Sequence, residues 1–188
     1  MHDASPLAEW ANFYVITGSS AAALTGLMFV VIALAADKRT NATKDGISIF
    51  STPTVVHFCA ALFISVVLSA PWRSLVHPAI VLGVTSLLGL AYVLRILLRT
   101  RRITTYRPDL EDWCWFVALP AFAYVVTLAA ALRLAPDPTL SLFLYAGATI
   151  LLVFLGIHNA WDVVTYIAVV NPELDRHPEP VEGPPAGP

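Results

Sequence analysis

Charged residues are scarce in this sequence of 188 residues. Asp, Glu, Lys and Arg together make up 13% of it, whereas hydrophobic residues make up 57%. Soluble domains contain roughly 25% charged and about 45–50% apolar residues, so this composition excludes an ordinary soluble domain. Only Arg95 and Asp162 lie well inside an apolar run, and the other charges fall between runs or in the tails. This pattern predicts several membrane-spanning helices, because the bilayer core excludes charge.

Cysteine is rare, and the motifs of common enzymes are missing. The two cysteines, Cys59 and Cys114, have no metal-binding spacing, and we interpret both as free thiols. The sequence contains no G-x-S-x-G, no H-E-x-x-H, no P-loop and no glycine-rich dinucleotide turn. A net charge of −2 and the lack of nucleic-acid motifs argue against a nucleic-acid partner. We therefore expect a protein without enzymatic activity that does not bind nucleic acid.

Basic residues are absent from the first 37 positions. The first apolar run contains Ala33-Leu34-Ala35, which resembles a signal-peptide cleavage site. A signal peptide needs a positively charged start and a short apolar region. Here the run is too long, and Asp3 and Glu9 make its start acidic. We therefore expect an uncleaved first membrane span.

Five apolar runs approach or exceed the roughly 20 helical residues that a bilayer crossing needs. Thr52-Pro53 is typical of a helix start, with Thr52 as the N-cap, so the second run is expected to begin there. Residues 172–188 are rich in proline and acid, which predicts a disordered cytoplasmic tail. The fold prediction is an all-α bundle over residues 1–171 with five transmembrane helices, at about 11–36, 53–70, 78–98, 114–133 and 139–168.

The basic residues predict the orientation of this bundle. An N-terminus outside and a C-terminus in the cytoplasm leave only Arg73 and Arg133 outside, and the other nine of the eleven basic residues inside. Such an excess follows the positive-inside rule. The tryptophans agree, because all five fall near predicted span boundaries, where an aromatic belt lies. They are Trp10 and Trp72 on the outer side and Trp113, Trp115 and Trp161 on the inner side.

Small residues mark one face of the first helix. Gly18, Ala22 and Gly26 are spaced i, i+4, i+8. Small residues at this spacing let a second helix approach closely, and close packing drives helix association in lipid. We expect this face to pack against a neighbour, which is either another helix of this chain or a second copy.

The connection after the third run is strongly basic. Arg95, Arg99 and Arg102 share one helical face, and Arg101 and Arg107 add to the positive charge. Arginines next to a span attract anionic lipids by about 1 kcal/mol each. Arg99, Arg101, Arg102 and Arg107 are therefore candidate contacts to anionic lipid, and the alternative is that they only fix the topology.

Ionisable and polar side chains gather at one predicted depth. His57, Arg95, His158, Asn159 and Asp162 all fall near the cytoplasmic edge of the hydrocarbon when depth is counted at ~1.5 Å per helical residue. His158 and Asp162 are one turn apart on the last helix. Ionisable groups in a span usually face the bundle interior or a wet cavity. These five residues form a candidate polar layer.

Four interpretations of the polar layer remain open. Asp162 could pair with Arg95 or His158 in a structural network, or His158 and Asp162 could carry ions or protons. His57, His158 and Asp162 could bind a metal, and His57 and His158 could ligate haem. Conduction has a weakness, because no acidic residue lies in the outer half of the predicted membrane. We expect no bound cofactor, with haem or a metal ion as the alternatives.

Two short segments suggest a family. Trp10-Ala11-Asn12-Phe13-Tyr14-Val15, with the small residues that follow, and His158-Asn159-Ala160-Trp161-Asp162 resemble a group of small, uncharacterised bacterial integral membrane proteins. This resemblance implies a multi-pass protein of the bacterial plasma membrane and implies no activity. Our expectation is an accessory or scaffold bundle that associates with itself or with a membrane-protein partner. An ion or proton channel or transporter component is the alternative.

Overall fold

The computed structural model describes residues 6–37, 44–100 and 113–174. These residues fold into long helices, with no strand among them. Each of the five expected apolar runs corresponds to one helical segment, so the all-α class is confirmed. The segments are α1 (Pro6–Asp37), α2 (Lys44–Ser69), α3 (Val76–Thr100), the π-helix η1 (Cys114–Ala118) followed by α5 (Leu119–Arg133), and α6 (Pro138–Leu174).

Four segments are long and apolar enough to cross a membrane within the described part of the chain. They are Pro6–Ala33, Val76–Leu98, Cys114–Arg133 and Pro138–Asp162. The apolar part of α2, Pro53–Ser69, is shorter than these four. A helical bundle with this many apolar segments has the composition of a multi-pass integral membrane protein.

The start of α2 differs from the prediction. The helix begins at Lys44, so Pro53 lies inside it, and Thr52 is not its N-cap. A proline fixes φ near a helical value and removes a single backbone donor. A helix can therefore continue through it at a local cost, which membrane bundles tolerate when other groups satisfy the freed carbonyl. The other segments begin within five residues of the predicted positions.

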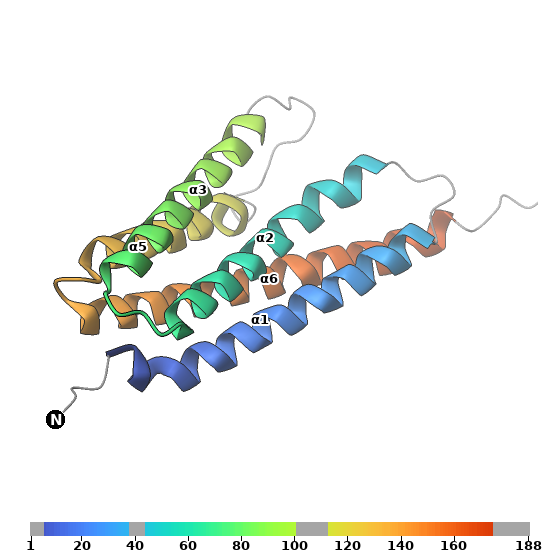
Figure 1. The fold of residues 1–188 in the computed structure, drawn as a ribbon. Coiled ribbons are helices and arrows are strands. Elements are labelled where there is room, and N and C mark those ends of the chain that lie inside the picture. The colour runs from blue at the N-terminus through green and yellow to red at the C-terminus, as the bar shows by residue number, and fades with distance from the viewer. Residues whose placement is uncertain (1–5, 38–43, 101–112, 175–188) are drawn as a thin grey trace, which may run out of the picture.

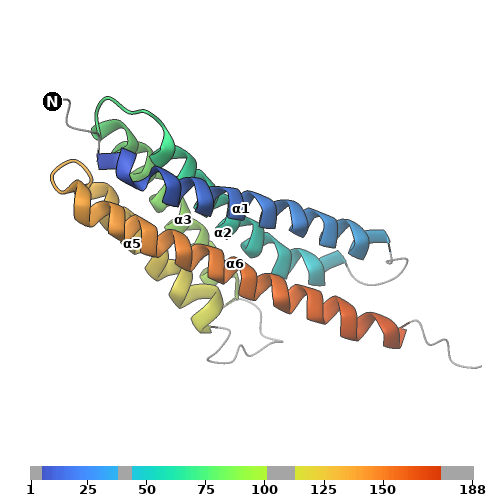
Figure 2. The same ribbon diagram turned by 90° about the horizontal axis from the view of Figure 1, so that it is seen from below.

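The helices form two groups. α1, α2 and α6 pack against one another, whereas α3 packs mainly against α5. α5 also packs against α6 and thereby joins the groups, so that α3 and α5 lie on one side of α6 and α1 lies on the other (Figure 1). Figure 2 shows α1, α2 and α6 side by side, extending past α5. α1 and α6 begin at the same end of the bundle, which we call the N-terminal end (Figure 1).

Two glycines allow aromatic rings to lie directly on a helix backbone. A Cβ atom at Gly89 of α3 would overlap the ring of Tyr124 in α5. A Cβ atom at Gly156 of α6 would likewise overlap the ring of Phe58 in α2. In lipid, helices associate through such close contacts because lipid chains are as apolar as the helix surface. Gly89 and Gly156 thus set the positions of α3 and α6 against their neighbours.

The small-residue face of α1 is divided. A Cβ at Gly18 would lie 2.9 Å from the Cβ of Ser65 in α2, so Gly18 is in close helix contact. Ala22 and Gly26 are exposed, and a Cβ at Gly26 would meet nothing within 4 Å. The buried stripe instead includes Leu7, Tyr14, Ala21 and Met28. Residues seven positions apart differ by only ~20° in direction around the helix axis, so they stay on the face that contacts α2 and α6. Residues four positions apart differ by a larger angle, so a series of them turns away from this face.

Candidate functional site

His57 and Phe58 of α2 lie at the centre of the bundle. His57 is 1% exposed, and its Nδ1 lies 3.3 Å from the hydroxyl of Tyr124 in α5. The Tyr124 ring packs on Gly89 of α3, and the Phe58 ring packs on Gly156 of α6. Two adjacent residues of α2 therefore connect it to α5 and α6, and Tyr124 continues the contact to α3.

Asn159 of α6 is buried next to this centre. Its side chain is 1% exposed, and neither its amide nitrogen nor its amide oxygen has a hydrogen-bond partner among the described residues. α2 and α6 run in opposite directions (Figure 1), and Gly156 of α6 contacts Phe58 of α2. Asn159 follows Gly156 by about one helical turn, so it lies closer to the start of α2 than Phe58 does. An amide buried without partners costs about 1–3 kcal/mol by mutational measures. Asn159 is thus the least satisfied large polar side chain in the described interior.

His158 and Asp162 lie together at the edge of the bundle. Nε2 of His158 is 3.8 Å from Oδ2 of Asp162, and their side chains are 28% and 42% exposed. The ring of His158 packs at 45° on Trp115 of η1, with 3.8 Å between the ring centroids. At this distance the His158–Asp162 contact is longer than a hydrogen bond. The pair therefore belongs to a partly exposed surface.

The π-helix η1 carries Trp115, the partner of His158. The backbone N–H of Leu119 donates to the carbonyl of Cys114, five residues back, which is the π-helical spacing. Pro120 follows in the first turn of α5, where the missing backbone N–H is tolerated best. The wide turn and the proline thus occur together, next to the contact between η1 and α6.

Arg95 does not pair with Asp162, contrary to one sequence prediction. Arg95 is exposed, and the only ion pair within the described residues joins His158 to Asp162. The physical reason is the helix order, because α3 packs mainly against α5 and has little contact with α6. Two residues at equal depth are in contact only when their helices are neighbours and the faces that carry these residues point towards each other.

The predicted polar layer is therefore split into separate environments. His57 lies beside Tyr124, His158 lies beside Trp115, and Arg95 is exposed on α3. Among the described residues, no three His, Cys, Asp or Glu side chains are close enough to hold a metal ion, so His57, His158 and Asp162 are not assembled as a ligand set. The ring neighbours of His57 and His158 are Tyr124 and Trp115, and haem ligation by the two histidines stays a prediction.

Neutral side chains make the interhelical hydrogen bonds, and sequence reasoning missed them. The Tyr14 hydroxyl of α1 donates to the Leu142 carbonyl of α6 at 3.0 Å. Ser86 of α3 donates to Thr127 of α5 at 2.9 Å. The hydroxyls of Thr17 in α1 and Ser65 in α2 lie 3.1 Å apart. Ser and Thr residues within the apolar runs could have indicated these hydrogen bonds. Their partners, however, depend on how each helix is rotated about its axis.

The chemistry available in the described residues is hydrogen bonding and close packing, together with one partly exposed His–Asp pair. Of the candidate lipid contacts, Arg99 belongs to the last turn of α3, and Arg101, Arg102 and Arg107 lie outside the described residues. Residues 175–188 of the predicted tail also lie outside them, while α6 continues through Pro172 to Leu174. Comparison with protein-family models, curated proteins and solved structures gives no match to this chain.

Proposed function

We propose that this protein is a non-enzymatic accessory or scaffold protein of the bacterial plasma membrane, which acts by associating side by side with a second copy of itself. The observation that carries this proposal is the outer face of α1. The main neighbours of α1 are α2 and α6. Away from these two helices, α1 exposes Val15, Ala22, Gly26 and Phe29.

Ala22 and Gly26 make this face suitable for another helix. They form a small-x-x-x-small pair, which lets two backbones approach closely in lipid. Gly26 has open space where a side chain would stand, and the exposed Phe29 and Val30 provide apolar area beside it. Inside the bundle, neutral hydrogen bonds join the helices of one chain. Association with a second copy therefore uses only the exposed residues of α1.

The proposed topology has five crossings, with the N-terminus outside and the C-terminus in the cytoplasm. α2 contains 26 residues, which gives a helix of about 39 Å, enough to cross roughly 30 Å of hydrocarbon. An odd number of crossings fits the placement of the start of α1 and the end of α6 at opposite ends of the bundle (Figure 1). The distribution of Lys and Arg selects which end is cytoplasmic.

Association can be tested by cross-linking and single-molecule photobleaching in lipid vesicles at low protein density. Gly26→Leu should raise the dimer dissociation constant by about tenfold, which corresponds to roughly 1.4 kcal/mol. The matched control is Gly147→Leu on α6, because Gly147 is also exposed with nothing within 4 Å. A wild-type protein that stays monomeric, or equal effects of the two substitutions, would contradict the proposal.

A second candidate function is ion or proton conduction, and one observation favours it. All buried side chains with unpartnered polar atoms in the described residues belong to one face of α6: Tyr145, Thr149 and Asn159. Such a face can hold water inside a membrane. The partly exposed His158 and Asp162 lie beyond it, near one end of the path.

Conduction is tested by proton flux into liposomes that contain the purified protein. Flux through this face should fall with Asn159→Leu and with the double change His158→Ala and Asp162→Asn. The buried Leu152 and Leu155 separate Thr149 from Asn159, so Leu155→Ser should raise the flux. Flux no greater than in empty liposomes removes this candidate, and flux that none of these changes alters places the path elsewhere.

A further inference from the structure

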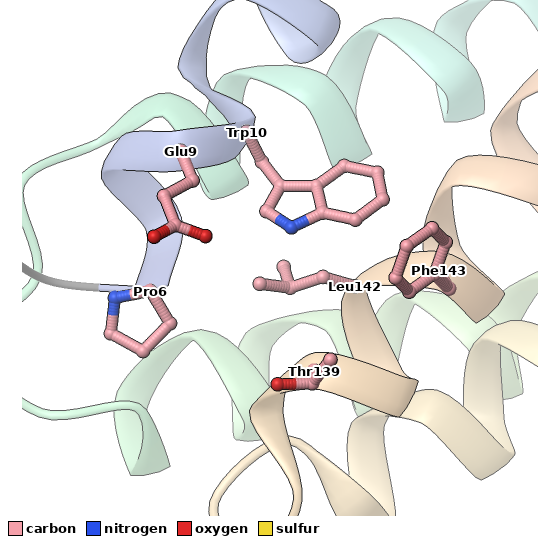
Figure 3. Close-up of a pocket in the computed structure, with 6 residues that line it drawn as sticks. All are labelled: Pro6, Glu9, Trp10, Thr139, Leu142 and Phe143. Atoms are coloured by element: carbon pink, nitrogen blue, oxygen red, sulfur yellow. The ribbon is translucent and has the colours of Figure 1, made fainter.

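A pocket of about 380 Å³ lies between the first turns of α1 and α6. Pro6, Glu9 and Trp10 line it from α1, and Thr139, Leu142 and Phe143 line it from α6. In Figure 3, the Glu9 carboxylate and the indole nitrogen of Trp10 face the same space, above Leu142 and Thr139. Its volume falls within the roughly 300–1,000 Å³ of small-molecule sites.

The polar groups of this pocket are unpaired within the described residues. Glu9 has no ion pair, and no hydrogen bond uses the Trp10 indole N–H or the Thr139 hydroxyl. Trp72, at the same end of the bundle, differs, because its indole N–H donates to the Val67 carbonyl at 2.6 Å. The pocket thus offers one anionic acceptor and two neutral donors.

Direct contacts between α1 and α6 hold the walls around these groups. The Trp10 and Phe143 rings meet edge to face at 4.7 Å between centroids. The hydrogen bond from Tyr14 to the Leu142 carbonyl ties α1 to α6 directly below. The pocket is therefore built by contacts that exist without any ligand, which lowers the entropy lost when a ligand binds.

We propose that this pocket binds the headgroup of a zwitterionic phospholipid that carries a primary ammonium group, as in phosphatidylethanolamine. The ammonium donates to the Glu9 carboxylate. The phosphodiester oxygens accept hydrogen bonds from the Trp10 indole and the Thr139 hydroxyl, and the lipid chains extend past the exposed Phe143. The pocket lies where the apolar part of α1 begins, at the level where tryptophan meets lipid headgroups.

The charges of the pocket select this headgroup over others. A quaternary ammonium has no N–H to donate to Glu9, and an anionic headgroup without an amine places its charge beside the carboxylate. A primary ammonium has three donors. This inference requires a membrane location and does not depend on side-by-side association through α1.

Native mass spectrometry of the full chain can test the proposal. The lipids are phosphatidylethanolamine, phosphatidylcholine and phosphatidylglycerol with identical acyl chains. Phosphatidylethanolamine should bind about tenfold more tightly than either other lipid. Glu9→Gln should abolish this preference, and Trp10→Phe, which keeps an aromatic ring but removes the N–H, should weaken the binding of all three lipids. Asp162→Asn removes one acid at the other end of the bundle and should change nothing.

Three results would overturn the proposal. They are equal binding of the three lipids by the wild type, an unchanged preference in Glu9→Gln, and an equal loss in Asp162→Asn. Soluble glycerophosphoethanolamine provides a further arm, because it carries the same ammonium and phosphodiester charges without acyl chains. It should compete only at concentrations at least a hundredfold higher, whereas competition at equal concentration would assign the pocket to a free metabolite instead of a lipid.

Discussion

Single side chains in this bundle interact mainly as neutral hydrogen-bonding groups. His57 and Tyr124 form the most central such contact, with the histidine fully buried and the tyrosine 2% exposed. In a low-dielectric interior, a buried polar group that loses its partner costs more than the net strength of the bond. The His57–Tyr124 bond is therefore a sensitive place to test the packing of α2 against α5.

Tyr124→Phe keeps the ring against Gly89 but removes the hydroxyl. We expect a loss of about 1–3 kcal/mol in the free energy of unfolding, because His57 Nδ1 is left without a partner. The measurement is thermal or denaturant unfolding in one detergent. Tyr92→Phe on α3 is the control, because Tyr92 is only partly buried and has no hydroxyl bond in the described residues. Equal stability of the two variants would show that the His57–Tyr124 contact has little energetic value.

Asp162 should contribute little to stability, although the sequence suggests a buried ion pair. Its side chain is 42% exposed, and its ionisable partner is His158 at 3.8 Å. Exposed pairs contribute roughly 0–1 kcal/mol, whereas breaking a buried pair costs about 3–5 kcal/mol. We expect Asp162→Asn to lower stability by less than about 1 kcal/mol. A loss of several kcal/mol in the same unfolding assay would mean that Asp162 has another partner.

Helices in this protein are positioned by glycines that accept aromatic rings. Gly156 receives Phe58, and Gly89 receives Tyr124. Gly147, nine residues before Gly156 on the same helix, meets nothing within 4 Å. The same substitution at Gly147 and Gly156 therefore separates helix propensity from helix contact.

Gly147→Ala and Gly156→Ala should differ in their effect on the free energy of unfolding. Alanine is favoured over glycine inside a helix by roughly 0.5–1 kcal/mol, so Gly147→Ala should leave stability unchanged or raise it. At Gly156 the added methyl meets the Phe58 ring, and overpacking of this kind costs typically 1–3 kcal/mol. Unfolding in detergent provides the comparison. If Phe58→Ala rescues Gly156→Ala, the ring contact is the cause, and a similar loss at both glycines would exclude it.

The sequence was sufficient to predict the helices but not their neighbours. Long apolar runs identify the helical segments, because a run that is buried in a membrane must satisfy its backbone hydrogen bonds internally and therefore forms a helix. The distance along each helix was also predictable, since the rise per residue is fixed. The rotation of each helix about its own axis was not, because the apolar character extends around most of each span. Arg95 and Asp162 are predicted to share a depth but do not form an ion pair, and Gly26 shares a spacing with Gly18 but not its contact.

The whole bundle is longer than the membrane that it is expected to cross. α6 has 37 residues and α1 has 32, which correspond to about 55 Å and 48 Å of helix against roughly 30 Å of hydrocarbon. α3 has 25 residues, or about 37 Å. In Figure 2, α1, α2 and α6 extend past α5 at the end where α6 finishes. This excess of helix lies at the end that the basic residues assign to the cytoplasm.

The topology prediction makes this assignment testable. In a variant with Cys59→Ala and Cys114→Ala, which removes both exposed thiols, Ser74→Cys between α2 and α3 should react with a membrane-impermeant maleimide in intact cells. A fluorescent reporter that matures only in the cytoplasm, fused after Pro188, should be bright, because the predicted topology assigns nine of the eleven basic residues to that side. Labelling of Ser74→Cys only after lysis, or activity of a periplasmic reporter after Pro188, would reverse the orientation. The proposed lipid pocket would then lie in the cytoplasmic leaflet, because Glu9 and Ser74 belong to the same end of the bundle (Figure 1).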